Sequence, residues 1–161
     1  MFRVGIGHDL HRFSKTPRPL RLGGVEIAEG RGLEGHSDAD VLLHSVCDAV
    51  LGALGLGDIG RHFPDDDPHL KGVSSVLLLE KVSAIMRERG YRLINLDAVV
   101  IAQEPRIAPH TEAMRREIAR VLGAEPADVN IKATSPEGMG SLGRREGIGA
   151  ETVALLGAVS P

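Results

Sequence analysis

Hydrophobic side chains recur along this chain with two different periods, and each period predicts its own kind of element. Alternation over 3–10 predicts a strand with apolar residues on one face, and it directs Asp9 and His11 to the other face together. Gly23-Gly24 indicates a hairpin within a second extended segment. The extended segments that we expect after the first strand are 20–28, 95–103, 129–133 and 149–159.

Three other segments, 37–54, 74–89 and 110–122, repeat apolar residues every three or four positions and predict helices. The run from Ser37 to Asp40 has the form of a capping box, so we expect the first helix to begin there. The element order is strands, two helices, a strand, a helix and two strands. It predicts a single α+β domain over 1–161, with a mixed β-sheet and helices packed on one face.

Composition and charge restrict the classes of function. The net charge is −3 and the arginines are scattered, which argues against a nucleic-acid partner or a membrane surface held by bulk electrostatics. Aromatic residues make up only 2% of the chain, so stacking on nucleic-acid bases is not expected. We find no signal-like segment, and the apolar stretch 49–57 is too short and glycine-rich to span a membrane. We therefore expect a cytoplasmic protein.

Asp9, His11 and His44 are candidate metal ligands. A structural zinc ion takes four protein ligands, whereas a catalytic zinc ion usually takes three and keeps a position for water or substrate. The alternatives are a polar strand end and a solvated histidine on a charged helix face. Asp40 and Asp48 lie four residues before and after His44, so either carboxylate is a candidate to orient its imidazole.

Cys47 leaves the nature of such a site open. It lies three residues after His44, where it is a possible fourth ligand that would close the site and make it structural. A free cysteine is more often a small buried hydrophobic residue, and we favour that interpretation. As the only cysteine in the chain, it also excludes an intrachain disulfide.

Two further segments are candidates for anion binding, although each also fits an ordinary turn. His36 precedes the first predicted helix, and the acidic, proline-broken loop 58–68 offers carboxylates that suit sugar hydroxyls. After the strand at 129–133, Ser135 is a candidate cap with Pro136 at a first helical position, and Glu137 suits a hard divalent cation.

Taken together, the order and spacing of these motifs closely resemble the 2-C-methyl-D-erythritol 2,4-cyclodiphosphate synthase family, over essentially the whole chain. The motifs are Asp9-x-His11, His36-Ser37-Asp38-x-Asp40-x-x-x-His44, Gly57-Asp58-Ile59-Gly60, Phe63-Pro64-Asp65-x-Asp67-Pro68, Ala102-Gln103-x-Pro105, Pro109-His110, Asn130-Ile131-Lys132-Ala133-Thr134 and Gly143-Arg144-x-Glu146-Gly147.

The resemblance implies a phosphorus-oxygen lyase of the non-mevalonate isoprenoid pathway. Its substrate would be 4-diphosphocytidyl-2-C-methyl-D-erythritol 2-phosphate, whose 2-phosphate attacks its own β-phosphate to form the cyclic diphosphate and release CMP. It also implies a homotrimer with the sheets around the threefold axis and active sites at subunit interfaces. The implied cofactors are one Zn²⁺ per subunit and Mg²⁺ or Mn²⁺ with the bound substrate.

The resemblance also implies roles for individual residues. Asp9, His11 and His44 match the zinc ligands, and Glu137 matches the ligand of the second cation. His36 and Ser135 match catalytic residues that stabilise the transition state. The implied substrate-binding residues are Asp9, Leu10, His11, His36, Ser37, Asp58, Ile59, Gly60, Phe63, Pro64, Asp65, Asp66, Asp67, Ala102, Gln103, Glu104, Pro105, Arg106, Ile107, Ala108, Thr134, Ser135, Pro136, Glu137, Ser141 and Arg144.

The chain departs from the family pattern at several positions, including Arg106, Ile107 and Ala108, whose side chains differ from those of many relatives. Ser135 replaces a more usual threonine and keeps the hydroxyl, so the chemistry is expected to survive. His8, Ser141 and Arg145 replace residues that are commonly apolar or glycine, which makes an apolar cavity on the trimer axis less expected.

Two rival functions are a zinc-stabilised protein that senses isoprenoid phosphates without turnover and a two-metal phosphohydrolase.

Overall fold

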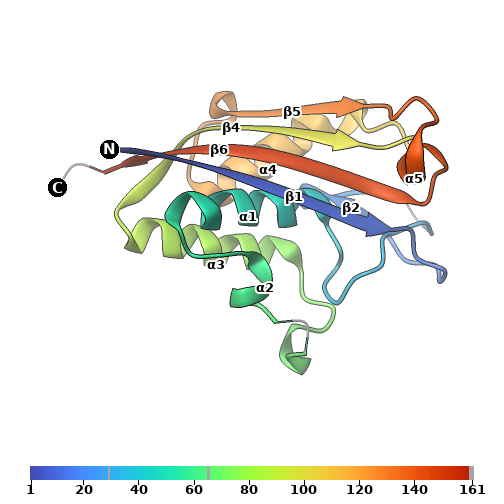
Figure 1. The fold of residues 1–161 in the computed structure, drawn as a ribbon, viewed down its shortest axis with the longest axis horizontal. Coiled ribbons are helices and arrows are strands. Elements are labelled where there is room, and N and C mark those ends of the chain that lie inside the picture. Colours follow the sequence, from blue (N-terminus) through green and yellow to red (C-terminus); the bar gives the residue numbers. More distant parts are fainter. Residues whose placement is uncertain (29, 65, 160–161) are drawn as a thin grey trace.

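The computed structural model describes residues 1–28, 30–64 and 66–159, and one four-stranded sheet organises them (Figure 1). The strands lie in the order β1–β6–β4–β5, with β4 and β5 parallel and the other two neighbouring pairs antiparallel, so the predicted mixed sheet is confirmed. The bounds are β1 (Phe2–Arg12), β4 (Tyr91–Ile101), β5 (Val129–Thr134) and β6 (Gly147–Ala158).

Three long helices cover one face of this sheet, as the sequence predicts (Figure 1). They are α1 (Val41–Leu54), α3 (Ser75–Glu88) and α4 (Thr111–Leu122). Shorter elements complete the described chain: the hairpin β2 (Leu20–Leu22) and β3 (Val25–Ala28), the helices α2 (Ile59–His62) and α5 (Gly140–Gly143), and the 3₁₀ turns η1 (Pro68–Leu70), η2 (Ala108–His110) and η3 (Pro126–Asp128). Within the described residues, we find no helix with the length and apolar character needed to cross a membrane.

Two predicted boundaries are wrong by four residues. The first helix begins at Val41 rather than near Ser37, because Ala39 has a φ of 60° and therefore interrupts any helical run from Ser37. The real N-cap is Asp40, whose carboxylate accepts a hydrogen bond from the Leu43 N–H. Strand β4 begins at Tyr91, before the predicted 95, because Tyr91 already pairs with β6 directly after the Gly90 turn.

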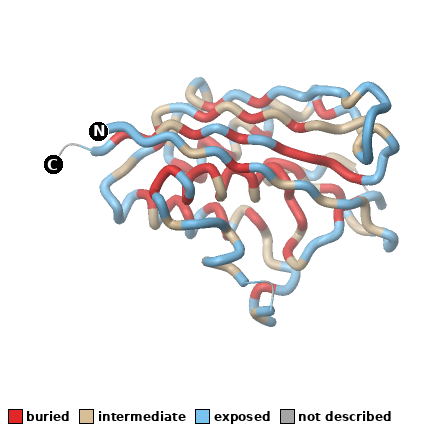
Figure 2. Tube along the Cα trace, in the orientation of Figure 1, coloured by how far each residue is buried: buried red, intermediate tan, exposed pale blue. Residues whose placement is uncertain are grey.

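Strand β1 turns its apolar face away from the helices. The side chains of Val4 and Ile6 are 67% and 71% exposed in the single chain. The face toward α1 carries Gly5 and Gly7 instead, and a Cβ atom on Gly7 would lie 1.9 Å from the Ser45 carbonyl oxygen. Because these glycines have no side chain, the helix backbone rests directly on the strand. The buried residues accordingly lie between the helices and the sheet (Figure 2).

Asp40 joins the start of α1 to the β2–β3 hairpin. Its buried carboxylate accepts hydrogen bonds from the backbone N–H groups of Gly23 at 2.9 Å, Gly24 at 2.7 Å and Leu43 at 3.0 Å. One side chain therefore satisfies two turn amides and one helix-terminal amide, and the bonds to Gly23 and Leu43 are buried.

We predict that Asp40→Ala lowers the free energy of unfolding by about 2–3 kcal/mol. The cap contributes about 1 kcal/mol, and leaving buried N–H groups unpaired costs about 1–3 kcal/mol. Urea denaturation of the variant and the wild type measures the difference. Asp40→Asn retains one acceptor oxygen and should lose less, so equal losses in both variants would contradict this account.

Candidate functional site

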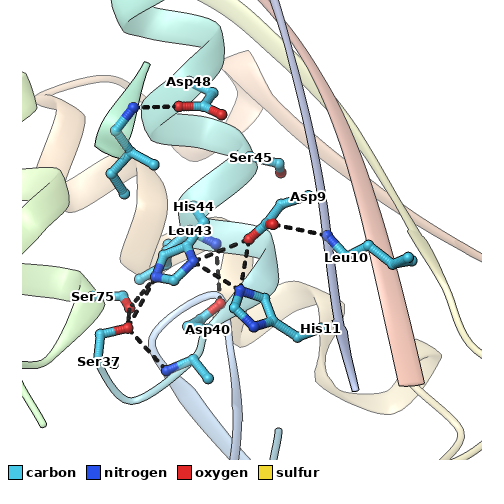
Figure 3. A network of polar contacts seen from close by, with 12 residues as sticks. Asp9, Leu10, His11, Ser37, Asp40, Leu43, His44, Ser45, Asp48 and Ser75 are labelled. Carbon is cyan, nitrogen blue, oxygen red and sulfur yellow. Dashed lines mark hydrogen bonds and ion pairs between the residues drawn. The ribbon is translucent and has the colours of Figure 1, made fainter. Parts of the chain in front are cut away.

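The end of β1 and the first turn of α1 bring Asp9, His11 and His44 together (Figure 3). Asp9 Oδ2 lies 2.9 Å from His11 Nε2 and 3.0 Å from His44 Nδ1, and the two imidazole nitrogens are 3.1 Å apart. The three residues are partly buried, and the glycine-mediated approach of α1 to β1 makes these distances possible. The predicted trio therefore forms a single cluster.

The chemistry of these three atoms fits a divalent cation. The backbone carbonyl oxygen of Glu34 lies 2.5 Å from His11 Nδ1 and can only accept a hydrogen bond. A neutral His11 therefore carries its proton on Nδ1, and the lone pair of its Nε2 points into the cluster. Two imidazole nitrogens and one carboxylate oxygen are ordinary zinc ligands. Ligand atoms of a tetrahedral zinc ion lie roughly 3.3 Å apart, since each is about 2.0–2.1 Å from the metal. The cluster is close to that spacing.

The charge state of the cluster supports the same conclusion. Burial acts to raise the pKa of Asp9, but hydrogen bonds and charge from His11 and His44 outweigh it and hold the pKa well below its usual range. Burial acts to lower the pKa of His11, but the hydrogen bond and charge of Asp9 outweigh it and raise the pKa. The carboxylate therefore strongly favours a positive charge beside it, which a proton or a metal ion can supply.

A cavity of about 220 Å³ opens beside the cluster. Its lining includes all three ligand candidates and the predicted substrate-binding residues His36, Ser37, Ile59, Gly60 and Phe63. The His36 imidazole is anchored because its Nε2 donates to the Asp67 carbonyl oxygen at 3.1 Å. The metal-ligand candidates and these five residues thus share one cavity.

The predicted orientation of His44 by a neighbouring carboxylate on its own helix is wrong. Asp40 is occupied by three backbone amides, and Asp48 accepts a hydrogen bond from the Ile59 N–H at 2.7 Å. Instead, His44 Nε2 lies 3.0 Å from the Ser75 hydroxyl and 3.1 Å from the Ser37 hydroxyl. Ser75 is the first residue of α3, so its proximity to His44 depends on how α3 packs against α1. No pattern in the sequence indicated this contact.

Cys47 is not part of the cluster. It is fully buried in the core, and the acidic, histidine and cysteine side chains of the described residues form a single metal-sized group, made of Asp9, His11 and His44. Burial raises the pKa of the Cys47 thiol well above its usual value, so it stays protonated. The interpretation of Cys47 as a buried hydrophobic residue is confirmed, and the closed four-ligand alternative is wrong for the described residues.

We predict that Cys47→Ala binds zinc with the same stoichiometry as the wild type. The thiol is buried in the core and is not part of the cluster, so its removal changes core packing and not the ligand set. Metal analysis of the dialysed protein after loading with zinc measures the stoichiometry. Loss of zinc from this variant, with its fold intact, would mean that the ligand set is different.

The candidates in the segments 102–108 and 134–137 lie at the same end of the sheet as Asp9 and His11 but outside this cavity. The segments 102–108 and 134–137 follow β4 and β5, and both strands run parallel to β1 but are separated from it by β6. Gln103 accepts a hydrogen bond from the Gly138 N–H and the Ala102 N–H donates to the Thr134 carbonyl oxygen, so the two segments are held next to each other. Within the second segment, the Ser135 hydroxyl accepts a hydrogen bond from the Glu137 N–H. Ser135 forms a turn, but no helix begins at Pro136.

Several other predicted residues have clear local positions. Asp58 caps α2 by accepting from the Arg61 N–H, and Asp67 caps η1 by accepting from the His69 N–H. Pro64 and Asp66 are exposed, and Asp65 lies outside the described residues.

Leu10 and Ser141 line a second cavity of about 140 Å³ at the end of β1. Arg144 forms a surface ion pair with Glu146 at 2.7 Å. Leu10 contacts the ligand cluster directly, because its N–H donates to Asp9 Oδ1 at 2.8 Å, and His11 also lines this second cavity.

A mixed sheet with helices on one face, and with two imidazoles and a carboxylate beside a cavity, defines an α+β protein with a candidate metal centre. The model of the YgbB family matches residues 2–157. This chain belongs to that family.

Individual relatives agree with this assignment. The 2-C-methyl-D-erythritol 2,4-cyclodiphosphate synthase of Syntrophomonas wolfei subsp. wolfei is 56% identical over 154 residues, which are 96% of this chain and 98% of that protein. The solved structure of the bifunctional IspDF from Campylobacter jejuni superposes with a TM-score of 0.95 at 42% identity, over 99% of this chain and 43% of that longer one. The CDP complex of IspF from Plasmodium falciparum has a TM-score of 0.86 at 30% identity, over 99% of this chain and 97% of that one.

Proposed function

We propose that this chain converts 4-diphosphocytidyl-2-C-methyl-D-erythritol 2-phosphate into 2-C-methyl-D-erythritol 2,4-cyclodiphosphate and CMP, as a step of the non-mevalonate isoprenoid pathway. The observation that carries the proposal is the cluster of Asp9, His11 and His44 beside a cavity, in a chain of this family. Three ligands leave a coordination position for a phosphate oxygen. The proposed compartment is the cytoplasm, where a highly charged nucleotide substrate is retained.

The reaction needs no nucleophile from the protein. An oxygen of the substrate's own 2-phosphate bonds to the β-phosphorus, and the bond from that phosphorus to the α-phosphate bridging oxygen breaks, so CMP leaves with the electron pair. The work of the protein is to fold the substrate for in-line attack and to offset negative charge. When bound, zinc supplies Lewis acidity to a β-phosphate oxygen, and Mg²⁺ or Mn²⁺ offsets charge on the leaving group.

We assign the roles of the chain's own residues from their positions. Asp9, His11 and His44 hold the zinc ion, and the anchored imidazole of His36 stabilises charge in the same cavity. The segments 58–60 and 63–67 hold the methylerythritol phosphate, with Ser37 beside them, because Ile59, Gly60, Phe63 and Ser37 line that cavity.

The second half of the site is proposed to come from a neighbouring copy in a homotrimer. The segments 102–108 and 134–137 bind the cytidine diphosphate, with Glu137 on the second cation and Ser135 as a catalytic hydroxyl. Within one chain, β6 separates these segments from the cavity. The exposed apolar face of β1, which includes Phe2, Val4 and Ile6, supports burial of this sheet face against other copies.

The deciding measurement is the product of the cytidyl substrate with zinc and magnesium present. We expect one CMP per cyclic diphosphate, with no oxygen from ¹⁸O-labelled water in either product. A two-metal phosphohydrolase would form linear products with the label, and a sensor would bind the nucleotide without releasing CMP. Either result would overturn the proposal.

We predict that two inactive variants restore activity when they are assembled together. His44→Ala removes a ligand from the cavity half, and Ser135→Ala removes a hydroxyl from the nucleotide half. In randomly mixed trimers, about a quarter of the interfaces combine two intact halves, so co-expressed variants should recover about a quarter of wild-type turnover. If both halves belong to one chain, mixing recovers nothing, and light scattering of the wild type tests the trimer directly.

A further inference from the structure

A second set of polar contacts lies behind His44, on the side away from Asp9 and His11. His44 Nε2 lies 3.0 Å from the Ser75 hydroxyl oxygen, and Ser75 is fully buried (Figure 3). The Ser75 hydroxyl in turn donates to Asp38 Oδ1 at 2.5 Å, and the Ser75 backbone N–H donates to Asp38 Oδ2 at 3.1 Å. A continuous path therefore runs from Asp38 through Ser75 to His44.

The direction of each hydrogen bond in this path follows from the groups themselves. An ionised carboxylate only accepts, so the single hydroxyl proton of Ser75 points to Asp38. The Ser75 oxygen then presents only lone pairs to His44, so this contact is a hydrogen bond when Nε2 carries the proton, and the Ser37 hydroxyl oxygen at 3.1 Å can accept from the same N–H. In that tautomer a neutral His44 has its lone pair on Nδ1, the atom that faces Asp9 and His11.

We propose that Asp38 and Ser75 are positioning residues for metal binding, which select the tautomer of His44 and hold its ring in place. The inference rests on the proposed function to the extent that the cluster binds a metal ion. Metal-binding histidines usually donate their second N–H to a carboxylate or carbonyl group. Here the carboxylate acts through an interposed serine.

Asp38 and Ser75 also stabilise the local structure, and the experiment must distinguish this role from the positioning of His44. Asp38 accepts the Ser75 N–H at the start of α3, so it helps to tie that helix end to the loop before α1. A local role predicts lower stability without any change in metal affinity. Positioning predicts a change in affinity that stability does not explain.

The experiment compares zinc affinity, measured on the full chain by competition with a chromophoric chelator. We expect Ser75→Ala and Asp38→Asn each to weaken zinc binding by about 10–100-fold. Ser83→Ala is the matched control, because Ser83 is equally buried in the same helix and its hydroxyl donates to the Val121 carbonyl oxygen, far from His44 in the chain. The control should bind zinc like the wild type.

The visible absorption of bound cobalt(II) reports the geometry of the metal ligands. In folded protein, a loss of stability alone does not change this absorption. A displaced His44 should alter the visible cobalt bands in Ser75→Ala and Asp38→Asn, but not in Ser83→Ala. Wild-type zinc affinity and cobalt spectra in both variants would overturn the proposal. If Ser75→Ala does not fold, Asp38→Asn decides alone, because it leaves the buried hydroxyl in place. Failure of the metal-site assignment is distinguishable, since the wild type itself would then bind no zinc.

Discussion

His44→Ala is expected to abolish CMP release, with a loss of roughly 10³-fold or more. The imidazole supplies one of the three ligand atoms, and Lewis-acid stabilisation of transition-state charge by a metal ion contributes several kcal/mol. Since about 1.4 kcal/mol corresponds to a factor of ten in rate, losing about 4 kcal/mol predicts this magnitude. The measurement is CMP release with saturating substrate and metals, together with zinc content after dialysis.

The result is specific only if the variant remains folded. His44 is partly exposed to the cavity, so its truncation enlarges an existing space and does not open a void in the core. His69→Ala is the control, because this exposed side chain belongs to η1 and does not line the cavity. A folded His44→Ala variant that keeps zinc and turns over at the wild-type rate would show that the cluster is not the catalytic centre.

Gly7→Ala is expected to lower the free energy of unfolding by on the order of 4 kcal/mol, above the usual cost of overpacking. The added Cβ would lie 1.9 Å from the Ser45 carbonyl oxygen and 2.8 Å from the Ala49 amide nitrogen. Both are backbone atoms of α1, which cannot rotate away as a side chain does. The helix must therefore move off β1, and His44 beside Ser45 moves with it.

Two measurements check this prediction. Urea denaturation gives the loss of stability, and chelator competition should show weaker zinc binding in the folded fraction, because His44 has left Asp9 and His11. Gly52→Ala is the matched control in α1, since its added Cβ would meet only the Ile6 carbonyl oxygen at an ordinary 3.7 Å. Within a helix this change should stabilise by up to about 1 kcal/mol. Equal stability of the two variants would contradict the close-approach account.

Local patterns in the sequence were sufficient for most elements and for the ligand trio. The apolar spacing predicted α3 and α4 to within a residue at each end, and alternation placed Asp9 and His11 on the same face of β1. The start of α1 was mispredicted because the positive φ of Ala39 has no recognisable signature in the residue type. Family resemblance, and not spacing, related the distant segments 102–108 and 134–137 to the site.

The sequence by itself determined the candidate ligands, the class of fold and the family, because these depend on periodicities and motifs within short stretches of chain. Only the tertiary structure decided how the site is built. It showed that Gly5 and Gly7 allow α1 to pack closely against β1. It also showed that Ser75 contacts His44 and Asp38, and that Cys47 is not part of the cluster. Each of these facts depends on contacts between residues far apart in the chain, whose geometry is set by the packing of whole elements.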